Sequence, residues 1–266
     1  MGNSLVDFKK GISTICTNAI FLLDASGSMS GERITQLNYA MQETLNALVK
    51  EGLKSETDIY VRVIRFNSML DWVIGTEQKG VLVSDAANMW KDLDASGGTD
   101  TAGAIEETLK ALKTEYFGYK NKKPIVILIT DGESNDPQQT KDAVDQLRYA
   151  MSGNTNKEKV VRIAIGVQDH NPNELEYFAS KGTIKDDQGE RKNTPLVFGV
   201  SDASSIADVI KNVAVSSLHS VGGAGAVALK DNDDNNTQTN TNGTADLVID
   251  DTPVIVDNTT KKTSTW

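Results

Sequence analysis

Residues 20–31 read Ile20-Phe21-Leu22-Leu23-Asp24-Ala25-Ser26-Gly27-Ser28-Met29-Ser30-Gly31. Apolar residues here lead directly into an acid, hydroxyl groups and glycines. An uninterrupted apolar run of this kind predicts a strand buried on both faces, as in the middle of a parallel sheet. The polar residues follow at the carboxyl end of that strand, where open α/β sheets place their ligand sites.

The polar half of this segment carries oxygen donors at a spacing of two residues, namely Asp24, Ser26 and Ser28. A carboxylate with two hydroxyls suits an oxygen-preferring octahedral cation such as Mg²⁺. Gly27 and Gly31 allow the backbone to turn tightly around it. The alternative interpretation is a polar turn between a strand and a helix, in which the serines cap the helix.

Two later segments favour the interpretation as a cation site over that as a polar turn. Residues 95–101 read Ala95-Ser96-Gly97-Gly98-Thr99-Asp100-Thr101, a glycine-rich loop ahead of a helical pattern. Residues 125–132 read Ile125-Val126-Ile127-Leu128-Ile129-Thr130-Asp131-Gly132, a second apolar strand that ends in an acid. The order Asp-x-Ser-x-Ser, Gly-Gly-Thr, Thr-Asp-Gly resembles the metal-ion-dependent adhesion site of the von Willebrand factor A family, over roughly residues 15–215.

The resemblance implies a set of residues around one divalent cation, which are Asp24, Ser26, Ser28, Thr99 and Asp131. It implies Mg²⁺ as the metal, with Mn²⁺ or Ca²⁺ as alternatives. It also implies that a Glu or Asp carboxylate of a protein partner completes the coordination sphere, because neutral hydroxyls leave the cation with excess positive charge.

Alternatives stay open at the second motif. Thr99 precedes a helix start, so it is also a candidate N-cap. Thr101 is a nearby alternative oxygen donor, and Asp100 is a candidate for orienting the ligands. Further along, Asp136 next to Pro137 is expected to cap a helix.

Strand and helix patterns alternate along the chain. The fold class predicted is α/β, a doubly wound, mostly parallel sheet with helices on both faces and one antiparallel edge strand. We expect strands at 18–23, 58–67, 70–74, 125–130, 160–167 and 196–200, helices at 34–50, 86–91, 101–116, 137–151, 172–180 and 203–217, and a loop or small hairpin at 181–193. The domain boundaries expected are a lead-in at 1–17, a domain at 18–220 and a flexible Asn-, Thr- and Asp-rich tail at 221–266.

Composition narrows the class of protein. The net charge of -10 over 266 residues argues against nucleic-acid binding. No apolar run reaches the ~20 residues of a membrane helix, and no signal peptide is evident. With Cys16 as the one cysteine, these features predict a cytoplasmic protein.

Catalysis is not expected. The histidines, His170 and His219, lie in no nucleophile motif, and Ser26 stands where a phosphatase-type Asp-x-Asp signature would have its second acid. A metal-dependent hydrolase built on Asp24 and Asp131 is the enzyme alternative, although it lacks an evident general base.

Residues 21–32 and Arg65-Phe66-Asn67 are similar to bacterial tellurium-resistance-type members of the family. That likeness implies a stress or signalling role beside a Ser/Thr kinase or a protein phosphatase, with tail threonines as candidate phosphoacceptors. The cysteine-rich module that many such proteins carry is missing here. The rival function is a scaffold that acts through its tail.

Overall fold

The computed structural model describes residues 16–113, 123–151, 158–168, 170–185, 191–200 and 205–222. The expected lead-in up to residue 15 and the expected tail from residue 223 onward lie outside the described residues. So do the last residues of the helix expected to reach 116 and the start of the one expected at 203.

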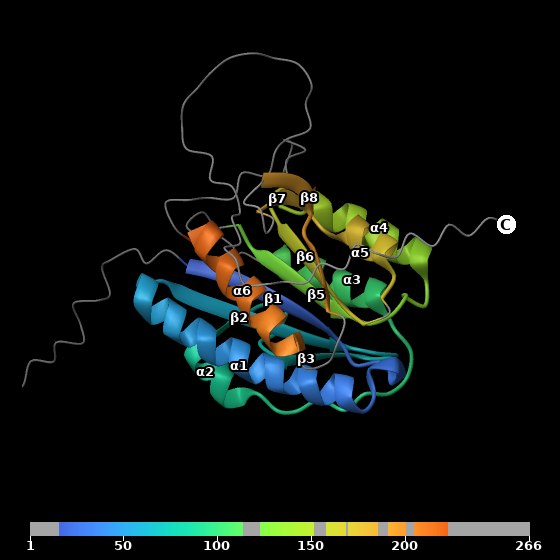
Figure 1. The fold of residues 1–266 in the computed structure, drawn as a ribbon, viewed down its shortest axis with the longest axis horizontal. Helices are drawn as coiled ribbons and strands as arrows, with labels where there is room; N and C mark the ends of the chain where they lie inside the picture. Colours follow the sequence, from blue (N-terminus) through green and yellow to red (C-terminus); the bar gives the residue numbers. More distant parts are fainter. Residues whose placement is uncertain are drawn as a thin grey trace, which may run out of the picture.

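A seven-stranded sheet forms the centre of the molecule (Figure 1). Its path is β3-β2-β1-β5-β6-β9, and the strands are β1 (Cys16–Asp24), β2 (Asp58–Phe66), β3 (Leu70–Ile74), β5 (Ile125–Thr130), β6 (Val161–Val167) and β9 (Val197–Val200). β1 runs parallel to both β2 and β5, and β6 continues the parallel order. The predicted antiparallel edge strand is β3, and the two-residue β4 (Val81–Leu82) also pairs antiparallel with β2.

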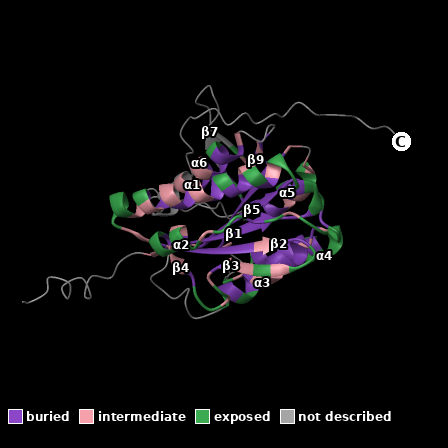
Figure 2. Cartoon of the chain, turned by 90° about the horizontal axis from the view of Figure 1, so that it is seen from below, coloured by how far each residue is buried: buried purple, intermediate pink, exposed green. Residues whose placement is uncertain are grey.

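The central strands are buried along nearly their whole length, as their unbroken apolar runs predict. Every residue of β5 and of β6 is buried, and in β1 only Cys16 is partly exposed. Figure 2 shows the buried residues concentrated in the sheet and in the helix faces that cover it. The polar loops after β1, β2 and β5 therefore emerge side by side from a rigid core.

Helices cover both faces of the sheet, as predicted. α1 (Glu32–Ser55) and α6 (Ile206–Gly222) pack against each other over one face, and α3 (Thr101–Leu112) and α4 (Pro137–Arg148) pack together over the other (Figures 1 and 2). α5 (Pro172–Phe178) contacts α4 and β6, and α2 (Val83–Met89) contacts α1. No helix among these described residues is long and apolar enough to cross a membrane.

Several boundaries differ from the sequence-based expectation. α1 does not end before Gly52, because the Gly52 carbonyl accepts the N–H of Thr57 and the chain leaves the helix only at Glu56, in a left-handed conformation. α2 begins three residues earlier than expected, directly after β4. In the region expected to be a loop or small hairpin, β7 (Lys181–Lys185) pairs antiparallel with β8 (Arg191–Pro195). β1 starts at Cys16, before the expected start at 18, and α6 extends to Gly222, beyond the expected end at 217.

Candidate metal centre

Three loops meet at the carboxyl edge of the sheet, after β1, before α3 and after β5. The Gly27 N–H donates to the Gly97 carbonyl at 2.9 Å, and the Ser96 N–H donates to the Ala25 carbonyl at 2.8 Å. The Asn135 N–H donates to the Thr99 carbonyl at 2.9 Å. These backbone bonds hold the loops of the three sequence motifs together.

The loop after β2 adds a fourth support, which sequence analysis did not assign to the site. Asn67 is buried, and its carbonyl accepts the Asp100 N–H at 3.0 Å. Its side-chain amide donates to Ser96 Oγ at 3.3 Å, and Ser68 Oγ accepts the Gly98 N–H at 2.7 Å. The available signal was a pair of polar residues directly after a core strand, the same pattern that marked Asp24.

Asp24 is fully buried at the end of β1, and both of its carboxylate oxygens accept hydrogen bonds. Oδ1 accepts the Ser26 N–H at 2.8 Å, and Oδ2 accepts the Thr130 hydroxyl at 2.6 Å. Burial raises the pKa of the Asp24 carboxyl, against these hydrogen bonds, which lower it. The protein thus holds the Asp24 carboxylate in one orientation, where water does not solvate it. A bound cation would offset the free-energy cost of burying that negative charge.

A line of hydroxyls connects the first motif to the third. Ser26 Oγ lies 2.9 Å from Ser28 Oγ, and the Ser28 hydroxyl donates to Asp131 Oδ1 at 2.8 Å. Ser26 and Asp131 are buried, whereas Ser28 is exposed. The structure therefore brings these three predicted site residues into direct contact, and Ser28 forms the part of the cluster that solvent reaches.

Thr99 is buried in the loop before α3, and its hydroxyl makes no hydrogen bond with any residue that the structure describes. The interpretation of Thr99 as the N-cap is wrong, because Asp100 caps α3 by accepting the Gly103 N–H at 2.9 Å. Asp100 thus has a capping role, and its expected role in orienting the ligands stays a prediction. Thr101 is the first residue of α3 and is also buried.

The serines do not cap the following helix either. Gly31, at φ 81°, is the N-cap of α1, and Ser26 makes no capping bond to the short 3₁₀ turn Gly27–Met29. The Ser26 and Ser28 hydroxyls are instead directed at each other and at Asp131. As expected, Asp136 caps α4, accepting the Gln139 N–H at 2.9 Å next to Pro137.

Arg33 is a further residue of the site that sequence analysis missed. Its guanidinium forms an ion pair with Asp131 Oδ2, and its Nη1 donates to the Ser28 carbonyl at 3.2 Å. Arg33 and Asp131 are 98 positions apart in the chain, so no local sequence pattern indicated this ion pair.

Comparison with known proteins shows the family of this chain. A family model of the von Willebrand factor type A domain matches residues 18–212. The chain belongs to this family. Among solved structures, this von Willebrand factor A domain resembles "von Willebrand factor type A from Catenulispora acidiphila", with a TM-score of 0.56 and 18% identity over 75% of this chain and 42% of that one. It also resembles proximal thread matrix protein 1 from the mussel byssus "with zinc occupied MIDAS motif", with a TM-score of 0.52 and 17% identity over 76% and 46%.

The chain spans only a small part of the length of the curated relatives that it matches. The human collagen alpha-5(VI) chain is 27% identical over 168 residues, which are 61% of this chain and 6% of the collagen chain. Mouse complement C2 is 25% identical over 213 residues, 74% of this chain and 26% of that protein. Neither relative supports the bacterial tellurium-resistance-type subtype that residues 21–32 suggested.

The residues of this von Willebrand factor A domain fit a divalent cation. Within the described part of the chain, no group of three or more His, Cys, Asp or Glu side chains could hold a metal ion, whereas the candidate cluster combines carboxylates with hydroxyl oxygens. Ser26, Ser28 and Thr99 would supply them, while Asp24 and Asp131 supply the negative charge. A set made only of oxygens suits a hard cation better than a soft one.

Proposed function

We propose that this chain is a metal-dependent protein-binding module. Ser26, Ser28 and Thr99, with Asp24 and Asp131, would hold one divalent cation, and a Glu or Asp carboxylate of a protein partner would complete its coordination. The observation that carries this proposal is the contact chain from Ser26 through Ser28 to Asp131, which is buried at both ends and exposed at Ser28.

The charges of the cluster support a carboxylate ligand. Asp24 and Asp131 are the acids, and Arg33 neutralises part of the charge of Asp131. A divalent cation balances the two carboxylates, and the hydroxyls add no charge, so Arg33 leaves the loaded cluster with one net positive charge near its exposed side. A carboxylate from outside is attracted by that charge, and it can replace a water bound to the cation.

We propose Mg²⁺ as the cation, because hydroxyl and carboxylate oxygens are its preferred ligands and it retains exchangeable waters. The zinc in the mussel byssus protein supports divalent binding by the same type of motif. Mn²⁺ and Ca²⁺ are the alternatives that the same donors accept.

The deciding experiment is isothermal titration of Mg²⁺ and Mn²⁺ into chelator-treated protein. We expect saturable binding to one site, and we expect Asp24→Ala to abolish it. Asp71→Ala is the matched control, since Asp71 is a more exposed acid at the same sheet edge, paired with Arg65. Absence of binding in the wild-type chain, or unchanged binding in Asp24→Ala, would contradict the proposal.

We propose binding in preference to catalysis. His170, the histidine nearest to the site in sequence, faces the Gln168 carbonyl through Nδ1 at 2.8 Å and packs on Gly166 and Gly199. That engagement does not favour its use as a general base beside Asp24. The kinase or phosphatase partner, the bacterial signalling context and the cytoplasmic location remain predictions that rest on sequence resemblance and composition.

A further inference from the structure

Arg33 links the metal cluster to a neighbouring strand. It lies in the first turn of α1, and 25% of its side chain is exposed, whereas the Asp131 side chain that it pairs with is fully buried. Its Nε donates to Gln168 Oε1 at 2.5 Å. One guanidinium thus contacts the loop after β1, the loop after β5 and the end of β6.

These contacts fix the guanidinium in one orientation. Gln168 is held in turn, because its N–H donates to the Val200 carbonyl at 2.6 Å and its backbone has a left-handed φ of 51°. A left-handed conformation at a non-glycine residue is kept only where the surroundings impose it. Arg33 is therefore preorganised at the exposed side of the cluster.

The guanidinium also has donors to spare. Nε and Nη1 carry all of the hydrogen bonds that Arg33 makes with the described residues, so Nη2 has two N–H groups left for a ligand. A carboxylate that binds a cation through one oxygen leaves its second oxygen as a hydrogen-bond acceptor. A guanidinium beside the cation suits that second oxygen, because charge-assisted bonds from arginine to carboxylate are strong and directional.

We propose that Arg33 is a second contact for the partner's carboxylate, and that it raises affinity for the carboxylate while it lowers affinity for the cation. This inference rests on the proposed function. The two effects have opposite signs because the positive charge of Arg33 repels the divalent cation of the site and attracts the negative carboxylate of the partner. Arg33 would then specify an acidic side chain over a neutral oxygen ligand.

The test uses the full chain loaded with Mn²⁺, with N-acetylglutamate amide as the probe. Water-proton relaxation reports the water that the carboxylate displaces from Mn²⁺, and isothermal titration reports Mn²⁺ affinity separately. For Arg33→Gln we expect Mn²⁺ affinity to rise at least about threefold and probe affinity to fall about tenfold. For Arg33→Lys, which keeps the charge without the planar fork, we expect near wild-type Mn²⁺ affinity and weakened probe binding.

Arg65→Gln is the matched control. Arg65 is also a partly exposed arginine paired with an aspartate at this edge of the sheet, and its loss changes the net charge equally. We expect it to change either affinity less than twofold. Circular dichroism in chelator checks that each variant is folded.

Two results would overturn the inference alone. If Mn²⁺ and probe affinity fall together in Arg33→Gln, Arg33 merely positions Asp131. If probe affinity is unchanged in both Arg33 variants, Arg33 does not touch the carboxylate. If instead the wild-type Mn²⁺ complex binds no carboxylate, the proposed function fails and this inference fails with it.

Discussion

The hydroxyl of Thr130 donates a 2.6 Å hydrogen bond to Oδ2 of Asp24, and so joins the ends of two adjacent parallel strands. Thr130 Oγ1 in turn accepts the Gly132 N–H at 3.2 Å, which shapes the turn that carries Asp131. One buried threonine therefore orients the first acid of the site and the loop of the second. This relationship assigns Thr130 a positioning role in the Thr-Asp-Gly motif, beside the ligand role expected for Asp131.

We predict that Thr130→Val weakens Mg²⁺ binding about tenfold and lowers the free energy of unfolding by about 1–3 kcal/mol. Valine keeps the shape of the side chain but leaves a buried carboxylate oxygen without its donor. Isothermal titration and urea unfolding measure the two effects. Thr108→Val is the control, because that buried hydroxyl donates to the Ala104 carbonyl inside α3. Equal Mg²⁺ affinity in both variants would show that Thr130 does not orient Asp24.

The raised pKa of Asp24 predicts a pH dependence of stability in metal-free protein. Because the buried Asp24 carboxyl binds its proton more tightly in the folded state than in the unfolded chain, protonation of Asp24 stabilises the fold. This stabilisation is fully present below the ordinary pKa of 3.8 and is lost as the pH rises through the raised pKa of the folded state. Asp24→Asn mimics the protonated form. We therefore expect the variant to unfold at a higher temperature than the wild type at pH 7, with the difference shrinking as the pH falls toward 4.

Mg²⁺ should reverse that order at pH 7. At a concentration of 100 Kd, the ion adds about 2.7 kcal/mol to wild-type stability, and it adds nothing to a variant that cannot bind it. Thermal unfolding of dialysed protein, with and without Mg²⁺, measures both effects. A metal-free Asp24→Asn variant that is less stable than the wild type at pH 7 would mean that the hydrogen bonds to Asp24 outweigh the cost of its burial.

The sequence predicted the parts of this molecule that depend on local pattern. The apolar runs before Asp24 and Asp131 are strands buried on both faces, and their alternation with helices indicated a doubly wound sheet. The order of three motifs then indicated the site, because parallel strands bring their carboxyl ends to one edge.

Long-range pairing escaped prediction. Arg33 lies in the first turn of a helix and looks like an ordinary exposed charge, and only the sheet order places it against Asp131 and Gln168. The support from Asn67 depends likewise on β2 lying beside β1. The capping role of Asp100 was missed for another reason, since Thr99 and Asp100 are both good N-caps and the position of the helix start decides between them.

Which threonine meets the cation is testable by paired substitution. Thr99 lies in the loop whose backbone contacts the Asp131 loop, and Thr101 lies inside α3. We predict that Thr99→Val lowers Mg²⁺ affinity at least about tenfold through loss of one oxygen ligand, whereas Thr101→Val leaves it nearly unchanged. Isothermal titration measures both. The reverse order would transfer the ligand role to Thr101.

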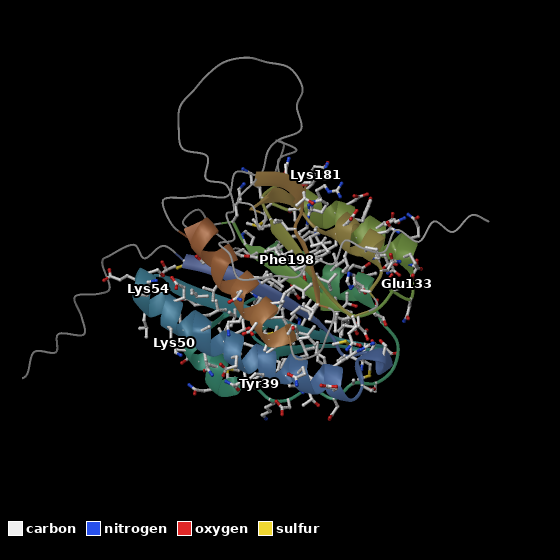
Figure 3. All side chains as sticks on the ribbon, viewed as in Figure 1. Tyr39, Lys50, Lys54, Glu133, Lys181 and Phe198 are labelled. Atoms are coloured by element: carbon white, nitrogen blue, oxygen red, sulfur yellow. The ribbon has the colours of Figure 1, made fainter. Side chains whose placement is uncertain are left out.

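The exposed end of α1 offers a control for electrostatic explanations of these results. Lys50 and Lys54 lie near the C-terminal end of α1, at the opposite end of the molecule from Glu133 in the loop after β5 (Figure 3). We predict that Lys50→Gln changes Mg²⁺ affinity less than twofold at 0.15 M salt, because charges separated by more than about 8 Å in solvent are largely screened. A larger effect in isothermal titration would mean that net charge, and not local geometry, governs binding.

Gly97 connects backbone conformation to metal affinity. Its φ is 77°, a Cβ added there would lie 2.8 Å from Ser68 Oγ, and its carbonyl accepts the Gly27 N–H. We predict that Gly97→Ala lowers the free energy of unfolding by about 1–3 kcal/mol and also weakens Mg²⁺ binding, because relief of the strain shifts the loop that carries Thr99.

Gly75→Ala is the matched control: the φ of Gly75 is 76°, and a Cβ added there would lie 2.9 Å from the Lys79 carbonyl oxygen. That variant should lose similar stability in urea unfolding but keep wild-type Mg²⁺ affinity, since Gly75 lies outside the three loops of the site. Equal losses of Mg²⁺ affinity in the two variants would show that binding follows global stability. Gly97 would then have no specific role in shaping the site.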